Sequence, residues 1–93
     1  MKYDIVPTSK YRKERSRMIK RGADLSLLDE AIRILADGKK LPAKYKDHKL
    51  SGNFNGFREC HLQSDWLLIY KIYEDKLILS LEHTGTHSEL FGI

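Results

Sequence analysis

The chain has 93 residues, which is the size of a single domain with one modest hydrophobic core. Its hydrophobic content of 41% is that of a globular protein and excludes a disordered chain. The net charge of +4 favours anionic partners such as nucleic acid or an acidic protein. The lone cysteine, Cys60, cannot form an internal disulfide, and we find neither a leader nor a membrane-spanning run. We therefore expect a cytoplasmic protein with no membrane partner.

The first part of the chain predicts a strand followed by a strongly basic helix. Residues 1–6 alternate in the manner of a strand. Thr8 or Ser9 is suited to cap a helix over residues 10–21, and Gly22 is suited to end it. Seven Lys and Arg side chains lie in this helix. They form either an ordinary solvated surface or one that binds RNA phosphates or an acidic protein.

A second helix is predicted from a cap at Asp24 or Ser26 to about residue 37, where Gly38 stops it. Its apolar residues recur at helical spacing and make a wide apolar face: Leu27, Leu28, Ala31, Ile32, Leu35 and Ala36. Because the two helices follow each other closely, we expect a helical hairpin that covers one face of a sheet.

The second half of the chain predicts the sheet. Residues 39–55 are irregular and include a lysine-rich segment, 44–50, which suits either phosphate contacts or an ordinary solvated loop. Two strands with a tight connection follow over residues 57–73, and the second is apolar enough to be buried on both faces. A last strand spans residues 77–83. The order predicts one α+β domain, residues 1–93, with an N-terminal strand, a helical hairpin and a three-stranded, mainly antiparallel sheet.

All four histidines lie in this second half of the chain. His61 and Asp65 flank the connection between the two paired strands, whereas His83 and His87 flank a bend at Gly85. If the strand after Asp65 and the last strand are neighbours, these groups converge at one end of the sheet.

Three kinds of chemistry use these residue types, and two of them fit the sequence poorly. A metal site fits poorly, because Gly85 interrupts the spacing between His83 and His87, so we predict no metal ligands. Nucleophilic catalysis by Cys60 fits poorly as well. Cys60 and its neighbour His61 point to opposite faces of a strand, and a buried, inert thiol is the better interpretation.

The third kind is general acid–base catalysis on RNA, which carries its own nucleophile in the 2′-hydroxyl. Histidine can act as acid or base near neutral pH, cationic side chains stabilise the charged phosphorane, and aromatic rings stack on bases. The candidates for these tasks are His48, His61, Asp65, Arg58, Lys46, His87, Trp66 and Phe91. Taken singly, Trp66 and Phe91 are better explained as core or rim residues, and His83 as a surface residue at a strand end.

Four short runs together resemble the YafQ-type toxins of the RelE superfamily. They are residues 49–52 (KLSG), 57–62 (FRECHL), 65–70 (DWLLIY) and 84–91 (TGTHSELF). The resemblance covers essentially the whole chain and implies the RelE fold, which is similar to that of microbial ribonucleases.

The resemblance also implies a function. Such toxins belong to bacterial type II toxin–antitoxin pairs and cleave mRNA in the A site of the 70S ribosome, without a metal or any other cofactor. A cognate antitoxin protein wraps the toxin, and operator DNA is bound only through the antitoxin complex. The alternative from another class is a non-catalytic module of the same fold that pairs with an antitoxin and acts as a DNA corepressor. A nuclease that cuts free RNA is a third hypothesis.

The family's catalytic positions correspond here to His48, His61, Asp65, His87 and Phe91. We expect His87 to be the general acid and His48 the base, with Asp65 as the rival base. His61 would contact the phosphate, and Phe91 would support the site or stack on a base. The residues expected to bind substrate are Lys46, Arg58, His83 and Trp66. The family usually has arginine at the position of His83, and histidine is only partly charged at neutral pH.

Overall fold

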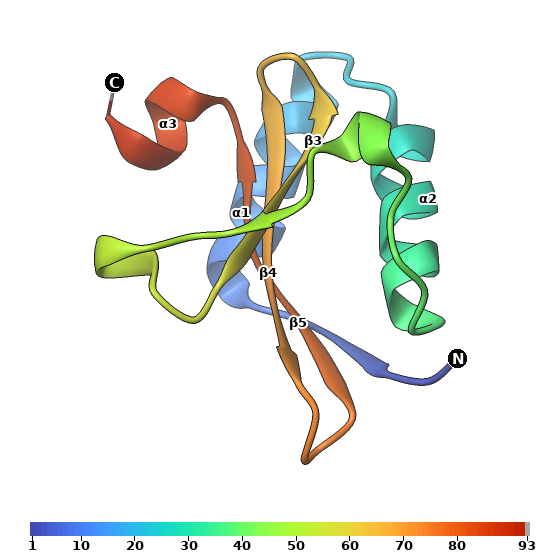
Figure 1. Cartoon of the computed structure of the whole chain (residues 1–93). Coiled ribbons are helices and arrows are strands. Elements are labelled where there is room, and N and C mark those ends of the chain that lie inside the picture. The colour runs from blue at the N-terminus through green and yellow to red at the C-terminus, as the bar shows by residue number, and fades with distance from the viewer. Residues whose placement is uncertain (93) are drawn as a thin grey trace.

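The computed structural model describes residues 1–92, which form a five-stranded sheet with two helices packed on one face (Figure 1). The elements, in chain order, are β1 (Asp4–Pro7), α1 (Ser9–Lys20), α2 (Leu25–Ala36), η1 (Ala43–Tyr45), β2 (His48–Lys49), η2 (Gly52–Phe54), β3 (Arg58–Gln63), β4 (Trp66–Tyr73), β5 (Ile78–Gly85) and α3 (His87–Phe91). Among the described residues, no helix is long and apolar enough to cross a bilayer.

The α+β prediction is confirmed, with two differences in detail. The strand order is β1-β5-β4-β3-β2, and β1 runs parallel to β5 while the other neighbours are antiparallel. The sheet therefore has one strand more than expected, because residues 48 and 49 pair with β3 inside the segment predicted to be irregular. The short helix α3 was also not predicted, although its capping box of Thr86 and Glu89 is visible in the sequence.

The two predicted helices form where their caps indicate. The Thr8 hydroxyl accepts a hydrogen bond from the first turn of α1, and the Asp24 carboxylate accepts one from the backbone N–H of Ser26. Gly22 and Gly38 follow the helices with φ of 79° and 77°, a left-handed conformation that favours glycine. Both helices bury their apolar faces against the same face of the sheet.

The alternation of side chains along β4 divides the molecule into two sides. Trp66, Leu68 and Tyr70 point into the main core under α1 and α2. Leu67 and Ile69 are also fully buried, but they belong to the other face of the sheet. The prediction that this strand is buried on both faces is therefore confirmed. In Figure 1 the helix α3 lies on the side of the sheet away from α2.

A β-bulge between β4 and β5 decides which side chains of β5 face each side. Ile69 lies opposite His83, but the next residue, Tyr70, lies opposite Leu81, so Glu82 is an extra residue in β5. The extra residue reverses the alternation of β5 beyond this point. His83 is thereby turned to the face away from the helices, and Thr84 to the core.

Thr84 holds the indole of Trp66 inside the core. Its hydroxyl accepts a hydrogen bond from Trp66 Nε1 (2.9 Å) and donates one to the carbonyl of Leu67 (2.8 Å). Thr84 is fully buried and Trp66 is 2% exposed. Trp66 thus has no ring face open for an RNA base, and its expected role in substrate binding is corrected.

We predict that Thr84→Val destabilises the fold, because it leaves the buried indole N–H without a partner. The expected loss in the free energy of unfolding is about 1–3 kcal/mol, measured by urea denaturation. Thr84→Ser is the matched control, since it keeps the hydroxyl and removes only a methyl group. If the valine variant is as stable as the serine variant, the buried hydrogen bond contributes nothing.

Candidate active site

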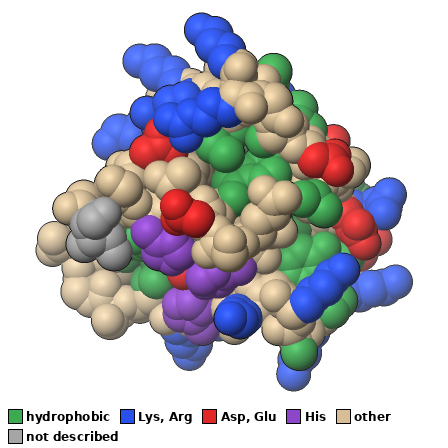
Figure 2. Space-filling view, turned by 90° about the horizontal axis from the view of Figure 1, so that it is seen from above, with side chains coloured by type: hydrophobic (Ala, Val, Ile, Leu, Met, Phe, Trp, Pro, Cys, Tyr) green, Lys and Arg blue, Asp and Glu red, His purple; other side chains and the backbone are tan. Residues whose placement is uncertain are grey.

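Three of the predicted histidines lie side by side on the face of the sheet away from α1 and α2. The ring centroids of His48 and His61 are 6.2 Å apart, and those of His61 and His87 are 5.6 Å apart. Figure 2 shows histidine side chains gathered on this part of the surface, with a carboxylate beside them. The structure thus brings His61 and His87 together, as the predicted convergence requires, and adds His48 from β2.

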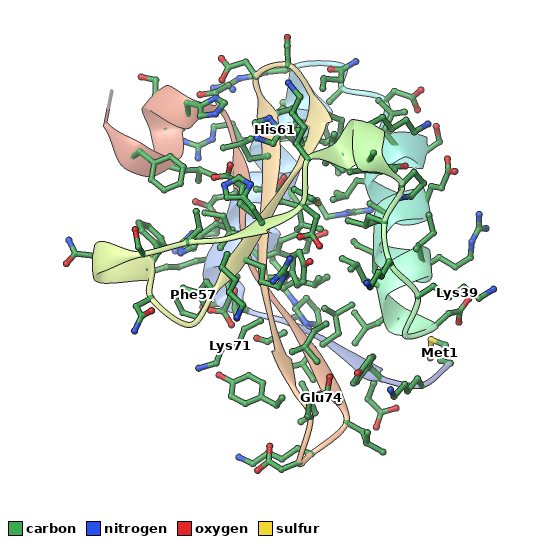
Figure 3. All side chains as sticks on the ribbon, viewed as in Figure 1. Met1, Lys39, Phe57, His61, Lys71 and Glu74 are labelled. Atoms are coloured by element: carbon green, nitrogen blue, oxygen red, sulfur yellow. The ribbon has the colours of Figure 1, made fainter. Side chains whose placement is uncertain are left out.

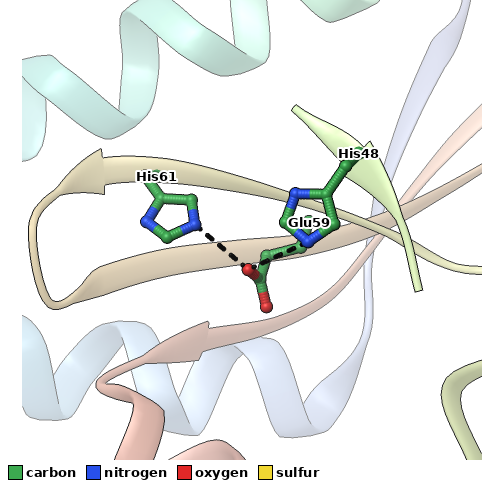
Figure 4. A group of neighbouring side chains, drawn as sticks. All are labelled: His48, Glu59 and His61. Atoms are coloured by element: carbon green, nitrogen blue, oxygen red, sulfur yellow. Dashed lines mark ion pairs between the residues drawn. The ribbon is translucent and has the colours of Figure 1, made fainter. Parts of the chain in front are cut away.

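A buried carboxylate joins two of these histidines. The same oxygen of Glu59, Oε1, lies 3.5 Å from His48 Nε2 and 3.2 Å from His61 Nε2 (Figure 4). Glu59 is only 4% exposed, and a carboxylate removed from water needs such partners. It therefore fixes the orientation of both imidazoles relative to each other.

The other nitrogen of His48 is held by the backbone. His48 Nδ1 lies 2.8 Å from the carbonyl oxygen of Lys46, which only accepts hydrogen bonds, so Nδ1 is the donor. Lys46 adopts a left-handed conformation, with φ of 49°, which closes the turn before β2. Its side chain lines a cavity of about 340 Å³ together with that of His61, so the predicted Lys46 does lie beside the histidines.

Asp65 orients His87. One carboxylate oxygen of Asp65 accepts hydrogen bonds from the backbone N–H of His87 (2.9 Å) and from its Nδ1 (2.7 Å). The backbone bond and then the ring bond lower the pKa of Asp65 below its ordinary value. Nε2 is then the ring nitrogen of His87 that is free to exchange a proton with a substrate.

An ion-pair cluster fixes α3, which carries His87 and Phe91, to helix α1. Arg21 donates two hydrogen bonds to the carboxylate of Glu89, and Arg17 Nε lies 3.2 Å from it. The same carboxylate completes the capping box by accepting from the backbone N–H of Thr86 (3.0 Å). The bonds from Arg21 come first among the causes that lower the pKa of Glu89 to about 2.

Aromatic side chains form the end of the site next to α3. The ring of Phe54 in η2 packs edge-to-face on Phe91 (5.2 Å between centroids), His83 (6.1 Å) and Phe57 (6.3 Å). His87 lies 6.4 Å from Phe91. The predicted Phe91 therefore belongs to the cluster, and His83 touches it through Phe54.

His83 itself is engaged by a carboxylate. Its Nδ1 lies 3.1 Å from Oε1 of Glu14 in α1, which also accepts from the backbone N–H of Thr84 (3.3 Å). The negative charge of Glu14 offsets the positive charge that a protonated His83 would present to a phosphate. His83 is therefore a weaker source of positive charge for a phosphate than an unpaired cation would be.

The structure does not bring Arg58 to this cluster, which corrects its expected place. Arg58 precedes Glu59 in β3 and points to the opposite face, where it donates to Asp47 (3.1 Å) and to the hydroxyl of Tyr70 (3.3 Å). Cys60 shares that face, and burial raises the pKa of its thiol to about 12. The predicted burial of Cys60 is confirmed, and its raised pKa is that of an unreactive thiol.

Two members of the site, Glu59 and Phe54, were not predicted. Glu59 could have been found, because it lies two residues before His61 and must share its face in a strand. Phe54 lies in a turn-rich segment without periodicity, and its packing on Phe91 joins residues 37 positions apart. No local signal in the sequence indicates that contact.

The comparison with known proteins gives the family. Residues 3–92 match the family described as the bacterial toxin of type II toxin–antitoxin systems, YafQ. The chain belongs to the YafQ toxin family. It is 43% identical to the mRNA interferase toxin YafQ of Escherichia coli K12 over 90 residues, which is 96% of each chain.

Two solved structures show the same fold. YafQ in the DinJ–YafQ complex of E. coli has a TM-score of 0.89 and 37% identity, over 97% of this chain and 99% of that one. A metal-bound toxin from Helicobacter pylori has a TM-score of 0.90 and 43% identity, over 96% and 99%. The RelE-type fold predicted from the sequence is therefore confirmed.

The Glu89 cluster should make the stability of the fold sensitive to acid. The pKa of Glu89 in the folded state, about 2, lies below the ordinary 4.5, so its stabilisation is present above the ordinary value and is lost as the pH falls toward 2. We predict that Glu89→Gln lowers the free energy of unfolding at pH 6 and that the difference from the unsubstituted chain shrinks at pH 3. Urea denaturation at the two pH values measures this. A difference that is the same at both would contradict it.

Proposed function

We propose that this chain cleaves mRNA in the ribosomal A site by metal-independent general acid–base catalysis. The observation that carries the proposal is the row of His48, His61 and His87, in which backbone and carboxylate partners direct each ring. Membership of the YafQ family, and the interferase name of the E. coli relative, support mRNA as the substrate. The 2′-hydroxyl of the RNA serves as the nucleophile.

His48 suits the role of general base. Since its Nδ1 donates to the carbonyl of Lys46, the neutral ring carries its lone pair on Nε2. In the resting site His61 Nε2 is the donor to Glu59, so His48 Nε2 takes the proton of the 2′-hydroxyl and the carboxylate of Glu59 then stabilises the imidazolium that forms. Glu59 in this way acts on His48 as a positioning and charge-stabilising residue.

His87 suits the role of general acid. The carboxylate of Asp65 accepts from Nδ1 and stabilises the charged ring, which leaves Nε2–H to protonate the 5′-oxygen that departs. Asp65 was the rival candidate for the base. Because its Oδ1 is already bonded twice to His87, orienting the acid is the role that we assign to it.

The remaining groups contact the substrate. His61 lies between the base and the acid, where the scissile phosphate must pass, and Lys46 adds a cation beside it. Phe91 and its neighbour Phe54 offer aromatic edges and faces to a splayed base. Because Glu14 pairs with His83 and Glu59 pairs with His61, Lys46 is the cation that supplies positive charge at the phosphate.

The partners follow from the same proposal. A cognate antitoxin covers the toxin, as DinJ accompanies YafQ in the E. coli complex, and operator DNA is bound only through that pair. The mRNA is presented by the 70S ribosome, which implies a cytoplasmic site of action. The alternative is a non-catalytic module that pairs with an antitoxin and acts as a DNA corepressor. The pairing of His83 with Glu14 favours it, because that pairing weakens the positive charge available to a phosphate.

We predict that His87→Gln lowers cleavage of ribosome-bound mRNA by about 10²–10⁴-fold, because it removes the proton donor. The measurement is the single-turnover rate on programmed 70S ribosomes, with naked RNA alongside to test for a nuclease that needs no ribosome. Lys39→Ala, on the opposite side of the molecule, is the control and should cleave normally. Binding of the antitoxin without any cleavage by the unsubstituted chain would favour the non-catalytic alternative.

The group of His48, Glu59 and His61 also has the composition of a metal site. One ligand atom from each lies within 4.8 Å of the others, and two imidazoles with a carboxylate suit Zn²⁺ or Cu²⁺. A similar toxin from H. pylori is described as metal-bound. In this chain a metal would occupy the nitrogens that general base catalysis needs, so we propose that it inhibits cleavage.

We therefore expect EDTA to leave the cleavage rate unchanged and added Cu²⁺ to lower it at micromolar concentration. Glu59→Gln should weaken Cu²⁺ binding, measured by calorimetry on the protein without ribosomes, because the amide is a poorer ligand than the carboxylate. Lys39→Ala again serves as the control for binding. If EDTA abolished cleavage and Zn²⁺ or Mg²⁺ restored it, the metal-independent mechanism would be wrong.

A further inference from the structure

A row of aromatic and lysine side chains continues from the histidine cluster along the same face of the sheet. It consists of Phe91, Phe54, Phe57, Lys71, Tyr73 and Lys76, which we call the aromatic–lysine row. Its contacts are unbroken from α3 to the β4–β5 hairpin. The mechanism proposed above uses only the first two members, so the purpose of the remaining four is open.

The cations in this row lie over aromatic rings. Lys71 Nζ is 5.6 Å from the ring centroid of Phe57 and 4.9 Å from that of Tyr73, and Lys76 Nζ is 5.8 Å from Tyr73. Figure 3 shows Phe57 and Lys71 close together below His61. Lys76 is exposed, and Phe57, Lys71 and Tyr73 are half-buried, so solvent reaches each of these side chains.

The position of the row relative to the histidines follows from strand geometry. Phe57 directly precedes β3 and lies two residues before Glu59, while Lys71 lies two residues after Ile69, the partner of Glu59 in β4. Alternate residues on one face of a strand are about 7 Å apart. The row therefore begins immediately beside the histidine cluster, within reach of the same RNA strand.

The charges near the row favour an anionic strand. Two carboxylates on this face of the sheet are already engaged, Glu59 by two histidines and Glu82 by the hydroxyl of Ser80. Lys49 lines a cavity of about 290 Å³ together with Phe57 and adds a further cation at the edge of the row. Alternating rings and cations are what a single strand of RNA uses, because bases stack on the rings and phosphates meet the lysines.

We propose that Phe57, Lys71, Tyr73 and Lys76 bind the mRNA nucleotides on the 3′ side of the cleaved phosphate. This inference rests on the proposed function, which sets the position of the phosphate. The 3′ side is assigned because the codon that precedes the A-site codon is already paired with the P-site tRNA. An acidic segment of an antitoxin would pair with the lysines alone, whereas RNA draws the lysines to its phosphates and stacks its bases on the rings that they leave, so RNA suits the row better.

Binding to programmed ribosomes tests this surface separately from catalysis. The chain carries His87→Gln, so that binding is measured without cleavage. Two mRNAs are compared, one that continues past the A-site codon and one that ends at it. Loss of the 3′ nucleotides should weaken binding by about tenfold, the effect of about one stacked base. The double substitution Lys71→Ala, Tyr73→Leu should weaken binding equally on the long mRNA and have no further effect on the short one.

Lys2→Ala is the matched control, since Lys2 lies 5.3 Å from the ring centroid of Tyr3, which belongs to the core on the other side of the sheet. It should leave both affinities unchanged. The inference is overturned if the double substitution has no effect on either mRNA, as a surface reserved for antitoxin would show. It is also overturned if the loss is equal on both mRNAs, as contacts to ribosomal RNA would show. Cleavage of ribosome-bound mRNA is measured on the chain with His87 intact. Absence of cleavage there would contradict the proposed function, whatever the binding experiment shows.

Discussion

The buried carboxylate of Glu59 is the interaction on which the arrangement of the site depends. It is removed from water on the face of the sheet that no long helix covers, and its partners are the Nε2 atoms of His48 and His61. A charge in that position needs such partners, and the pairing of β2 with β3 brings His48 opposite Glu59. In the two-residue strand β2, His48 is the residue that pairs directly with Glu59 of β3.

The second half of the site is held independently of the first. Asp65 at the β3–β4 connection fixes His87, and Glu89 ties α3 to Arg17 and Arg21 of α1. The basic helix α1 thus has a structural task besides its charge. Because base and acid are carried by separate elements, a substitution in one of them should disturb one proton transfer and leave the geometry of the other unchanged.

Local signals predicted the helices and the double burial of β4, because caps and periodicity are properties of neighbouring residues. The gathering of His48, His61, Asp65 and His87 came from family resemblance and was supported by the order of the strands. The sequence could not predict that Arg58 pairs with Asp47 or that Trp66 bonds to Thr84. The second of these contacts depends on the bulge at Glu82, and a single extra residue in a strand leaves no pattern of its own.

The chemical ends of the RNA fragments test the acid–base mechanism most directly. If the 2′-hydroxyl attacks the phosphate and His87 protonates the departing 5′-oxygen, the upstream fragment ends in a 2′,3′-cyclic phosphate or its 3′-phosphate hydrolysis product. The downstream fragment then begins with a 5′-hydroxyl. Mass spectrometry of fragments from ribosome-bound mRNA distinguishes these ends. A 3′-hydroxyl together with a 5′-phosphate would mean that water attacked from the other side, and would contradict the roles assigned to His48 and His87.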